Sequence, residues 1–192
     1  MNDNPAFGAG LQPFMGIPSF MRLPVSRELK DVDVAILGVP FDSGTSYRAG
    51  TRFGPRKIRE ASLMIWGHNS TLNVTPLKKL TVVDYGDVSV IPTSIEHTMT
   101  AITKTASEVI ETGTTLITLG GDHSIALPLL RAHAKKHGPV SGRVRAHKEA
   151  PSFKIDGRCQ VHPPVKRNGR RTVFFAGDGS VTSGRASPSN WA

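Results

Sequence analysis

The sequence predicts an α/β fold in which a parallel sheet lies between layers of helices. Three short apolar runs rich in β-branched residues alternate with segments of helical periodicity. Each run is closed by glycine, proline or aspartate, as expected of strands buried on both faces. Such alternation gives right-handed crossovers, with binding sites at the carboxyl ends of the strands.

The first predicted strand spans Val32 to Val39, which glycine and proline close. Pro40 to Phe53 holds too many Gly, Ser and Thr for a core element, so we expect a loop there. Pro55 suits the first turn of a helix that continues through Met64. Residues 1–31 are rich in Gly, Pro and Phe. We expect them to form an arm over the domain or a neighbouring subunit, or a frayed terminus.

The second predicted strand is Leu80 to Asp84. Thr93 and Glu96 have the spacing of a capping box, which predicts that a helix begins there. Apolar residues recur at helical spacing up to Ile110, and Gly113 is placed to end the helix.

The third predicted strand, Thr114 to Leu119, leads through a Gly-Gly turn into a helix from about Ser124 to His137. Basic residues fill the last turn of this helix, where they suit the negative end of the helix dipole. Gly138 is placed to stop it.

The chain changes character near Val140. Residues 1–140 hold 14 Lys and Arg against 12 Asp and Glu, a net charge of +2, whereas residues 141–192 hold 10 against 3, a net charge of +7. Charged residues interrupt every apolar pair where a fourth strand should follow, and only Val173 to Ala176 has the composition of a strand. We therefore expect a domain over residues 32–140 and a basic, mostly disordered tail.

Composition excludes several classes of protein. No apolar run approaches the length of about 18 residues that a membrane span needs, and no basic start precedes an apolar stretch, so we expect a cytoplasmic protein. Cys159 is the only cysteine, which excludes an internal disulfide framework and a Cys-based zinc site. The basic tail suggests nucleic acid, but low aromatic content and the lack of a regular basic helix argue against that partner.

The GGDHS motif at Gly120 to Ser124 places His123 where a strand ends and a helix begins. This is a natural position for a metal ligand. The same turn could instead present backbone N–H groups to an anion, and a lone histidine there can be structural.

Two further motifs follow the other strands. FDSGTSYRAGTRFGPRKIR, Phe41 to Arg59, follows the first strand, and DYGD, Asp84 to Asp87, follows the second. With GGDHS, they make residues 37–140 resemble the agmatinase-type members of the arginase/ureohydrolase family. The resemblance implies a three-layer α/β/α domain on a mainly parallel, eight-stranded sheet, which is incomplete in this chain.

The resemblance also implies a chemistry. A guanidinium is resonance-stabilised, and neutral water is a poor nucleophile toward it. The family holds a water between two Mn²⁺ ions, which lower its pKa and stabilise the tetrahedral intermediate that collapses to urea and an amine. The ligands come from the GGDHS histidine, a DAHxD motif after the next strand, and a later DxD pair.

By this resemblance His123 corresponds to the first manganese ligand. Tyr47 and Arg48 lie in the loop similar to the agmatinase entrance, which implies contact with the substrate. No residue of this chain is assigned a catalytic role.

The rest of the family's ligand set does not match. Where the family has DAHxD, residues 145–149 read RAHKE, and an arginine in place of the first aspartate would repel the ions. We therefore do not expect His147 and Glu149 to be ligands. Lys154 to Asp156 does not restore the DxD pair, and Asp178 is expected in a turn.

Other polar residues have simpler interpretations. His133 and His137 are four apart, a spacing compatible with a shared metal, but the lysines between them favour a solvated basic face. We expect surface positions for the histidines His68 and His97. We expect surface or subunit contacts for three arginines, because in the pocket they would oppose a cationic substrate: Arg52, Arg56 and Arg59.

We therefore expect an agmatinase-like ureohydrolase that hydrolyses agmatine or a similar linear guanidino compound with manganese. We expect it to be inactive as this truncated chain, because one ligand cannot hold a binuclear site. The alternative is a non-catalytic fragment or assembly partner that docks on full-length subunits through its arm and its sheet edge. Homo-oligomer formation stays open.

The abrupt change at Val140 predicts a property of the gene. A shifted reading frame or an unspliced intron gives composition without hydrophobic period, which gradual divergence does not. We expect genomic DNA downstream of the Val140 codon, read in another frame or past an intron, to encode an apolar strand ending in DAHxD and, further on, a DxD pair. Sequencing that locus checks this. If no frame contains them, the tail is a genuine segment, and the assembly-partner hypothesis takes precedence.

Overall fold

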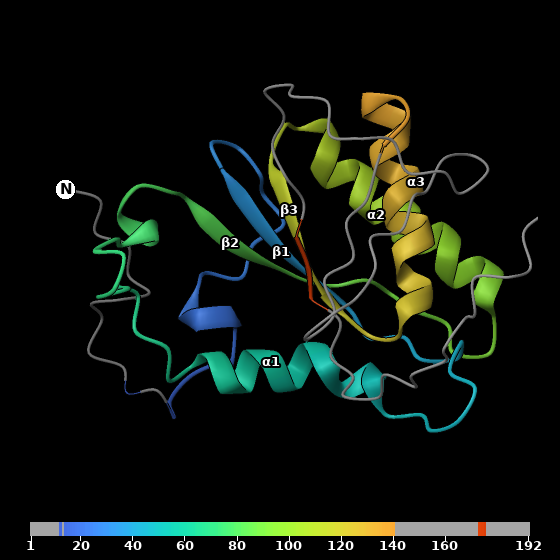
Figure 1. Ribbon diagram of the computed structural model, residues 1–192, viewed down its shortest axis with the longest axis horizontal. Coiled ribbons are helices and arrows are strands. Elements are labelled where there is room, and N and C mark those ends of the chain that lie inside the picture. Colours follow the sequence, from blue (N-terminus) through green and yellow to red (C-terminus); the bar gives the residue numbers. More distant parts are fainter. Residues whose placement is uncertain (1–11, 13, 141–172, 176–192) are drawn as a thin grey trace, which may run out of the picture.

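Four parallel strands form the centre of the fold, in the order β2-β1-β3-β4 (Figure 1). The computed structural model describes residue 12, residues 14–140 and residues 173–175. The strands are β1 Val34–Val39, β2 Val82–Asp87, β3 Thr115–Gly120 and β4 Val173–Phe175. The α-helices are α1 Gly54–Ser62, α2 Ile95–Glu111 and α3 Ala126–His137, and the 3-10 helices are η1 Phe20–Arg22, η2 Thr51–Phe53, η3 Pro76–Lys78 and η4 His123–Ile125.

The predicted α/β/α architecture is confirmed. Helix α1 lies on one side of the sheet and helices α2 and α3 lie on the other (Figure 1). All three predicted strands and all three predicted helices are present, with ends that differ from the prediction by a few residues. None of the helices in the described part of the chain is both long and apolar enough to cross a bilayer.

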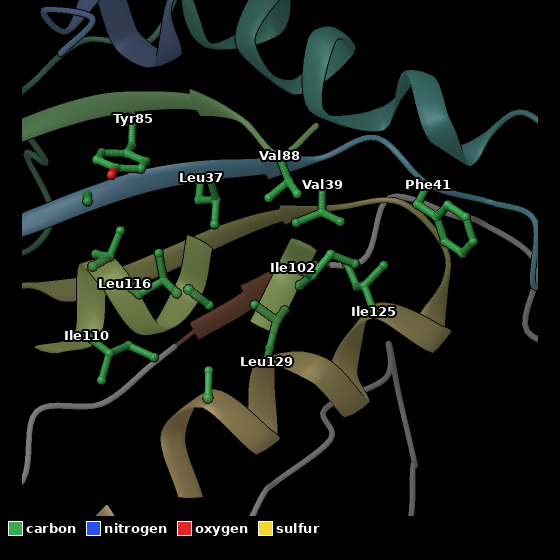
Figure 2. Packing of buried hydrophobic residues seen from close by; sticks show 14 of the residues in the cluster. Leu37, Val39, Phe41, Tyr85, Val88, Ile102, Ile110, Leu116, Ile125 and Leu129 are labelled. Atoms are coloured by element: carbon green, nitrogen blue, oxygen red, sulfur yellow. The ribbon is translucent and has the colours of Figure 1, made fainter. Parts of the chain in front are cut away.

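Strand β1 carries apolar side chains on both faces, because a parallel strand between two helical layers has no solvent side. Ala35, Leu37 and Val39 face helices α2 and α3, where they pack with Ile102 and Leu129 (Figure 2). The alternate residues pack on the other face, under α1 and η1, in a second cluster with members from each strand and helix there: Val34, Ile36, Val82, Leu119, Ile58, Phe20 and Met21.

The tail contributes a strand that the sequence analysis did not place in the sheet. Val173–Phe175 forms β4, which pairs in parallel with Ile117 to Leu119 of β3. Over these three residues the edge of β3 is therefore paired within the chain and is not free for docking on another subunit. The physical reason is that β3 presents a row of unpaired N–H and C=O groups, which an apolar β-branched and aromatic segment satisfies. The other residues of the predicted disordered tail lie outside the described part of the chain.

The start of α2 differs from the predicted capping box. Ser94, not Thr93, is the N-cap, and its hydroxyl accepts the backbone N–H of His97 at 3.4 Å. Its Oγ also lies 2.6 Å from the His97 ring nitrogen Nδ1. A turn closed by the Ser94 N–H and the Ile91 carbonyl shifts the helix start by one residue.

A buried ion pair joins α1 to the end of β2. The guanidinium of Arg59 donates to both carboxylate oxygens of Asp84, from Nε at 2.7 Å and from Nη2 at 2.8 Å. Its Nη1 donates to Asp87 at 2.7 Å. The prediction of a surface or subunit contact for Arg59 is therefore wrong. Gly38 of β1 makes room for this group, because a Cβ there would lie 1.8 Å from Asp87 Oδ1.

The same carboxylate holds the segment before the sheet. Asp84 Oδ2 accepts the backbone N–H of Phe20 at 2.8 Å, and the Asp84 backbone pairs with Pro24 and Ser26. Met21 donates its N–H to the Ser62 hydroxyl of α1 at 2.7 Å. Residues 19–26 thus lie along α1 and β2 of their own chain.

Removing the Asp84 charge is expected to destabilise the fold. Breaking a buried ion pair by deleting one partner costs about 3–5 kcal/mol, and Asp84→Asn should fall near the lower end because Asp87 still pairs with Arg59. Urea denaturation followed by circular dichroism measures this. The matched control is Glu60→Gln, whose exposed partners Arg56 and Lys57 are on the same helix and should have little effect. Equal loss in both variants would contradict the assignment.

The same pair predicts a direction for acid sensitivity. Burial by itself raises the pKa of Asp84, but the hydrogen bonds from Arg59 and from the N–H groups of Phe20 and Gly86 outweigh it and hold that pKa below its ordinary value. Its contribution to stability is therefore complete above about pH 4 and is lost as pH falls through the lowered pKa. The gap in unfolding free energy between wild type and Asp84→Asn should narrow when urea denaturation is repeated at pH 3. A gap that stays constant from pH 7 to pH 3 would show that the pKa of Asp84 is the same in the folded and the unfolded protein, which would contradict a lowered pKa.

Candidate functional site

The carboxyl ends of β1, β2 and β3 lie together, because the three strands are parallel neighbours. We call this side of the sheet the carboxyl edge, and 'this edge' below refers to it and not to the lateral edge of a strand. The register pairs Val39 with Gly120 across β1 and β3, and Gly38 with Asp87 across β1 and β2. The three motifs that follow these strands therefore meet at this edge, as parallel α/β sheets predict for a binding site.

His123 is the first residue of the short η4 turn, and its side chain is exposed. Asp122 precedes it as the N-cap and is buried. Its Oδ1 accepts the Ser124 backbone N–H at 2.8 Å and the Ser124 hydroxyl. The predicted metal ligand therefore lies beyond the end of β3, on a turn that the hydrogen bonds between Asp122 and Ser124 stabilise.

Backbone contacts draw the end of β3 against the chain after β1. The Gly121 N–H donates to the Val39 carbonyl at 3.1 Å, and the Asp122 N–H donates to the Phe41 carbonyl at 2.8 Å. A Cβ on Gly121 would lie 1.9 Å from the Phe41 carbonyl oxygen, so this approach excludes any side chain. The second glycine of GGDHS therefore serves this close contact.

Asp42 closes the loop that follows β1, here called the 42–52 loop. It is buried, and its carboxylate accepts the Gly50 N–H at 2.6 Å, the Arg52 N–H at 3.2 Å and the Arg52 Nε–H at 2.6 Å. The Arg52 hydrogen bond, aided by the two backbone N–H groups, holds the pKa of Asp42 below its ordinary value despite burial. The Arg52 side chain is 37% exposed, so its predicted surface position is confirmed, and its ionic partner is Asp42 of the same chain.

Sequence reasoning did not single out Asp42. The available signal was an aspartate directly after a buried strand, at the start of a loop rich in glycine. Such a loop has N–H groups that need an acceptor. Neither spacing nor composition indicates that Arg52, ten residues later, returns to it.

Tyr47 and Arg48 lie at the apex of the 42–52 loop, and both are exposed. The Arg48 guanidinium carbon lies 5.1 Å from the centre of the Tyr47 ring, a cation–π distance. The structure therefore brings the predicted substrate residues to the same edge as His123. Within residues 14–140, no hydrogen bond or ion pair joins either of them to that histidine.

The carboxylates at this edge are already engaged. Asp42 pairs with Arg52, and Asp84 and Asp87 pair with Arg59, while Asp122 accepts from Ser124 and from Gly44. Within the described residues no three His, Cys, Asp or Glu side chains gather in a way that could hold a metal ion. These residues alone do not fit a binuclear manganese site. The predicted non-ligands His147 and Glu149, and Asp156 and Asp178, lie outside the described residues.

The other histidines of residues 14–140 have contacts or exposed positions that involve no metal. His133 and His137 stack with ring centres 6.0 Å apart on α3. Burial lowers the pKa of His133, and the nearby His137 and Lys136 lower it further, which indicates a locally cationic surface. His68 and His97 are exposed as predicted, and Arg56 is an exposed partner of Glu60.

The groove on the outer side of α2 and α3 is not part of this edge. Its volume is about 710 Å³, and side chains of both helices line it, among them Met99, Lys104, Glu108 and Arg131. None of the residues of the three motifs that follow β1, β2 and β3 contributes to it. The candidate site is therefore the exposed edge, with His123, the 42–52 loop and the Arg59 ion pair.

The chain is similar to curated enzymes that act on guanidino compounds by name. The chain is 44% identical to the human mitochondrial guanidino acid hydrolase over 154 residues, which cover 80% of this chain and 44% of that protein. It is 38% identical to the mitochondrial agmatinase of Gallus gallus, of which it covers 45%. The chain thus spans less than half the length of these relatives.

The fold of this chain is also similar to that of a solved structure. A hypothetical agmatinase from Burkholderia thailandensis is 38% identical, and it superposes with a TM-score of 0.63 over 66% of this chain and 40% of its own. The arginase family profile matches residues 32–146, which include all three motifs at the sheet edge. The chain belongs to the arginase family.

Proposed function

We propose that this chain supplies the amino-terminal part of a ureohydrolase site, with His123 as a metal ligand and with Tyr47 and Arg48 at the substrate entrance. The observation that carries the proposal is the junction at the sheet edge. There the 42–52 loop follows β1 and the His123 turn follows β3. A hydrogen bond of 2.9 Å between Gly44 and Asp122, which are 78 residues apart in the sequence, joins them. Sites of parallel α/β folds are built from such loops.

The substrate class we propose is a linear guanidino compound. Both curated relatives are named for enzymes of this class, one for guanidino acids and one for agmatine. Arg52 and Arg59 near the edge do not repel a cationic guanidinium, because carboxylates neutralise both of them. Arg52 pairs with Asp42, and Arg59 pairs with Asp84 and Asp87. The objection that arginines here would repel the substrate therefore does not apply to these two.

The proposed metal is manganese, which the family resemblance implies. When bound, it would supply a hydroxide nucleophile and stabilise charge on the intermediate. Of the described residues only His123 is placed as a ligand, so we propose that the chain by itself is inactive. The cytoplasmic location stays a prediction, and both curated relatives are named as mitochondrial proteins.

A second candidate function is that of a non-catalytic assembly partner. The observation in its favour is an exposed apolar loop after α1, where Met64, Trp66 and Leu72 are 71%, 86% and 70% exposed. The predicted docking surfaces support it less. Residues 19–26 lie on α1 and β2 of the same chain, and β4 pairs with the edge of β3. Co-purification with a full-length homologue would favour this candidate, whether or not the chain binds metal.

Metal content is the first test. Because one histidine cannot hold two hard cations, protein dialysed with excess Mn²⁺ should retain well under one ion per chain. Elemental analysis after removal of free metal measures this. Two tightly bound ions per chain would contradict the proposal that the chain is inactive, and would place ligands outside the described residues.

A chimera tests the function of the family segment. We expect residues 1–140, joined to the carboxyl-terminal remainder of the human relative, to release urea from a guanidino substrate in the presence of Mn²⁺. In this chimera His123→Ala should lower the rate at least about a hundredfold, since residues that merely support metal ligands already cost 10- to 100-fold. His137→Ala on the exposed end of α3 is the matched control and should leave the rate unchanged. A folded chimera without activity, or equal loss in both variants, would argue against the proposed role.

A further inference from the structure

We infer that Asp122 is a positioning residue, which ties the 42–52 loop to the His123 turn so that both halves of the proposed site form one unit. The inference rests on the proposed function only in calling these halves a site. Asp122 is not itself offered as a metal ligand, because its carboxylate oxygens are already engaged.

The two oxygens of Asp122 serve two different elements. Oδ2 accepts the Gly44 N–H of the loop at 2.9 Å. Oδ1 accepts the Ser124 N–H at 2.8 Å and also the Ser124 hydroxyl, directly after His123. One buried carboxylate therefore bridges segments from β1 and β3, and only an acceptor at both ends can do so.

The surroundings are shaped for this bridge. A Cβ on Gly44 would lie 2.9 Å from Asp122 Oδ2 and 3.0 Å from the Ser124 hydroxyl oxygen, so the loop reaches the carboxylate only because residue 44 has no side chain. Gly121 is excluded from carrying a side chain by the Phe41 carbonyl. Both glycines thus act at the junction that Asp122 closes.

The bridge fixes the approach to the site. Tyr47 and Arg48 sit between Gly44, which Asp122 holds, and Gly50, which Asp42 holds. The loop apex is therefore fastened at both of its ends. Of the two fastenings, the Asp122 contact is the one that relates the apex to His123.

The substitution Asp122→Asn separates these roles. Asparagine has the same shape but only one acceptor oxygen, so its NH₂ group must face a donor on one of the two elements. Loss of a hydrogen bond to a charged group should raise amide exchange at Gly44 roughly ten- to a hundredfold, while amides of Ile102 and Val109 in the core of α2 stay as in wild type. Hydrogen exchange of ¹⁵N-labelled full-length protein measures this.

The His123 ring provides a readout that a merely structural role would not move. The imidazole ¹³C–¹H signal of His123 should shift in Asp122→Asn, and also in Gly44→Ala, which leaves the neighbours of His123 and their charges unchanged. It should stay in place in the matched control Asp33→Asn, whose carboxylate accepts the Thr81 N–H at 3.0 Å at the opposite end of the sheet. That control should change exchange at Thr81 alone.

A second variant approaches the junction from the other side. Gly44→Ala leaves Asp122 intact but forces the loop away from it, and should reproduce both the local exchange and the His123 shift. If Asp122→Asn does not fold, this variant decides. Unchanged Gly44 exchange in folded Asp122→Asn, a rise spread equally over the α2 amides, or an unmoved His123 signal in Gly44→Ala would overturn the inference. None of these measurements needs metal or substrate, so they stand or fall separately from the chimera assay.

Discussion

The position of β1 between β2 and β3 is the constraint on which the rest of the structure depends. It is paired along both edges and covered on both faces, so it has no side that tolerates water. Every residue from 34 to 39 is accordingly apolar or glycine. Because its neighbours run parallel to it, all three loops that follow these strands emerge at the same edge.

That convergence brings charge together as well as loops. Asp42, Asp87 and Asp122 lie where the strands end, and Asp84 lies within β2 beside them. Each carboxylate needs a partner in or near a buried setting. Two arginines and several backbone N–H groups donate hydrogen bonds to these carboxylates. The carboxylates are thereby used to hold the edge together. They are not left to bind hard cations, which is why His123 is the one described candidate ligand at an edge rich in aspartate.

The loop architecture could be predicted only in outline. The motifs after each strand predicted that their loops would meet at the carboxyl ends of the strands, and the loops with Tyr47, Arg48 and His123 lie there. The Gly-Gly pair predicted a turn, and the structure adds that Gly121 lets the Phe41 carbonyl approach. The partners of Arg52 and Arg59 were not predicted, because local composition does not show which carboxylate a cation will meet.

What the sequence by itself determined were the elements and their order, because these depend on near neighbours. The strands, the helices and their order follow from apolar periodicity and from glycine and proline, and the motif spacing identified the family. The tertiary structure alone decided the partners of the charged groups. Asp84 meets Arg59 from 25 residues away, Asp122 meets Gly44 from 78, and Val173–Phe175 pairs with β3 across the tail. Such contacts depend on strand register and helix placement, which side-chain spacing along the chain does not encode.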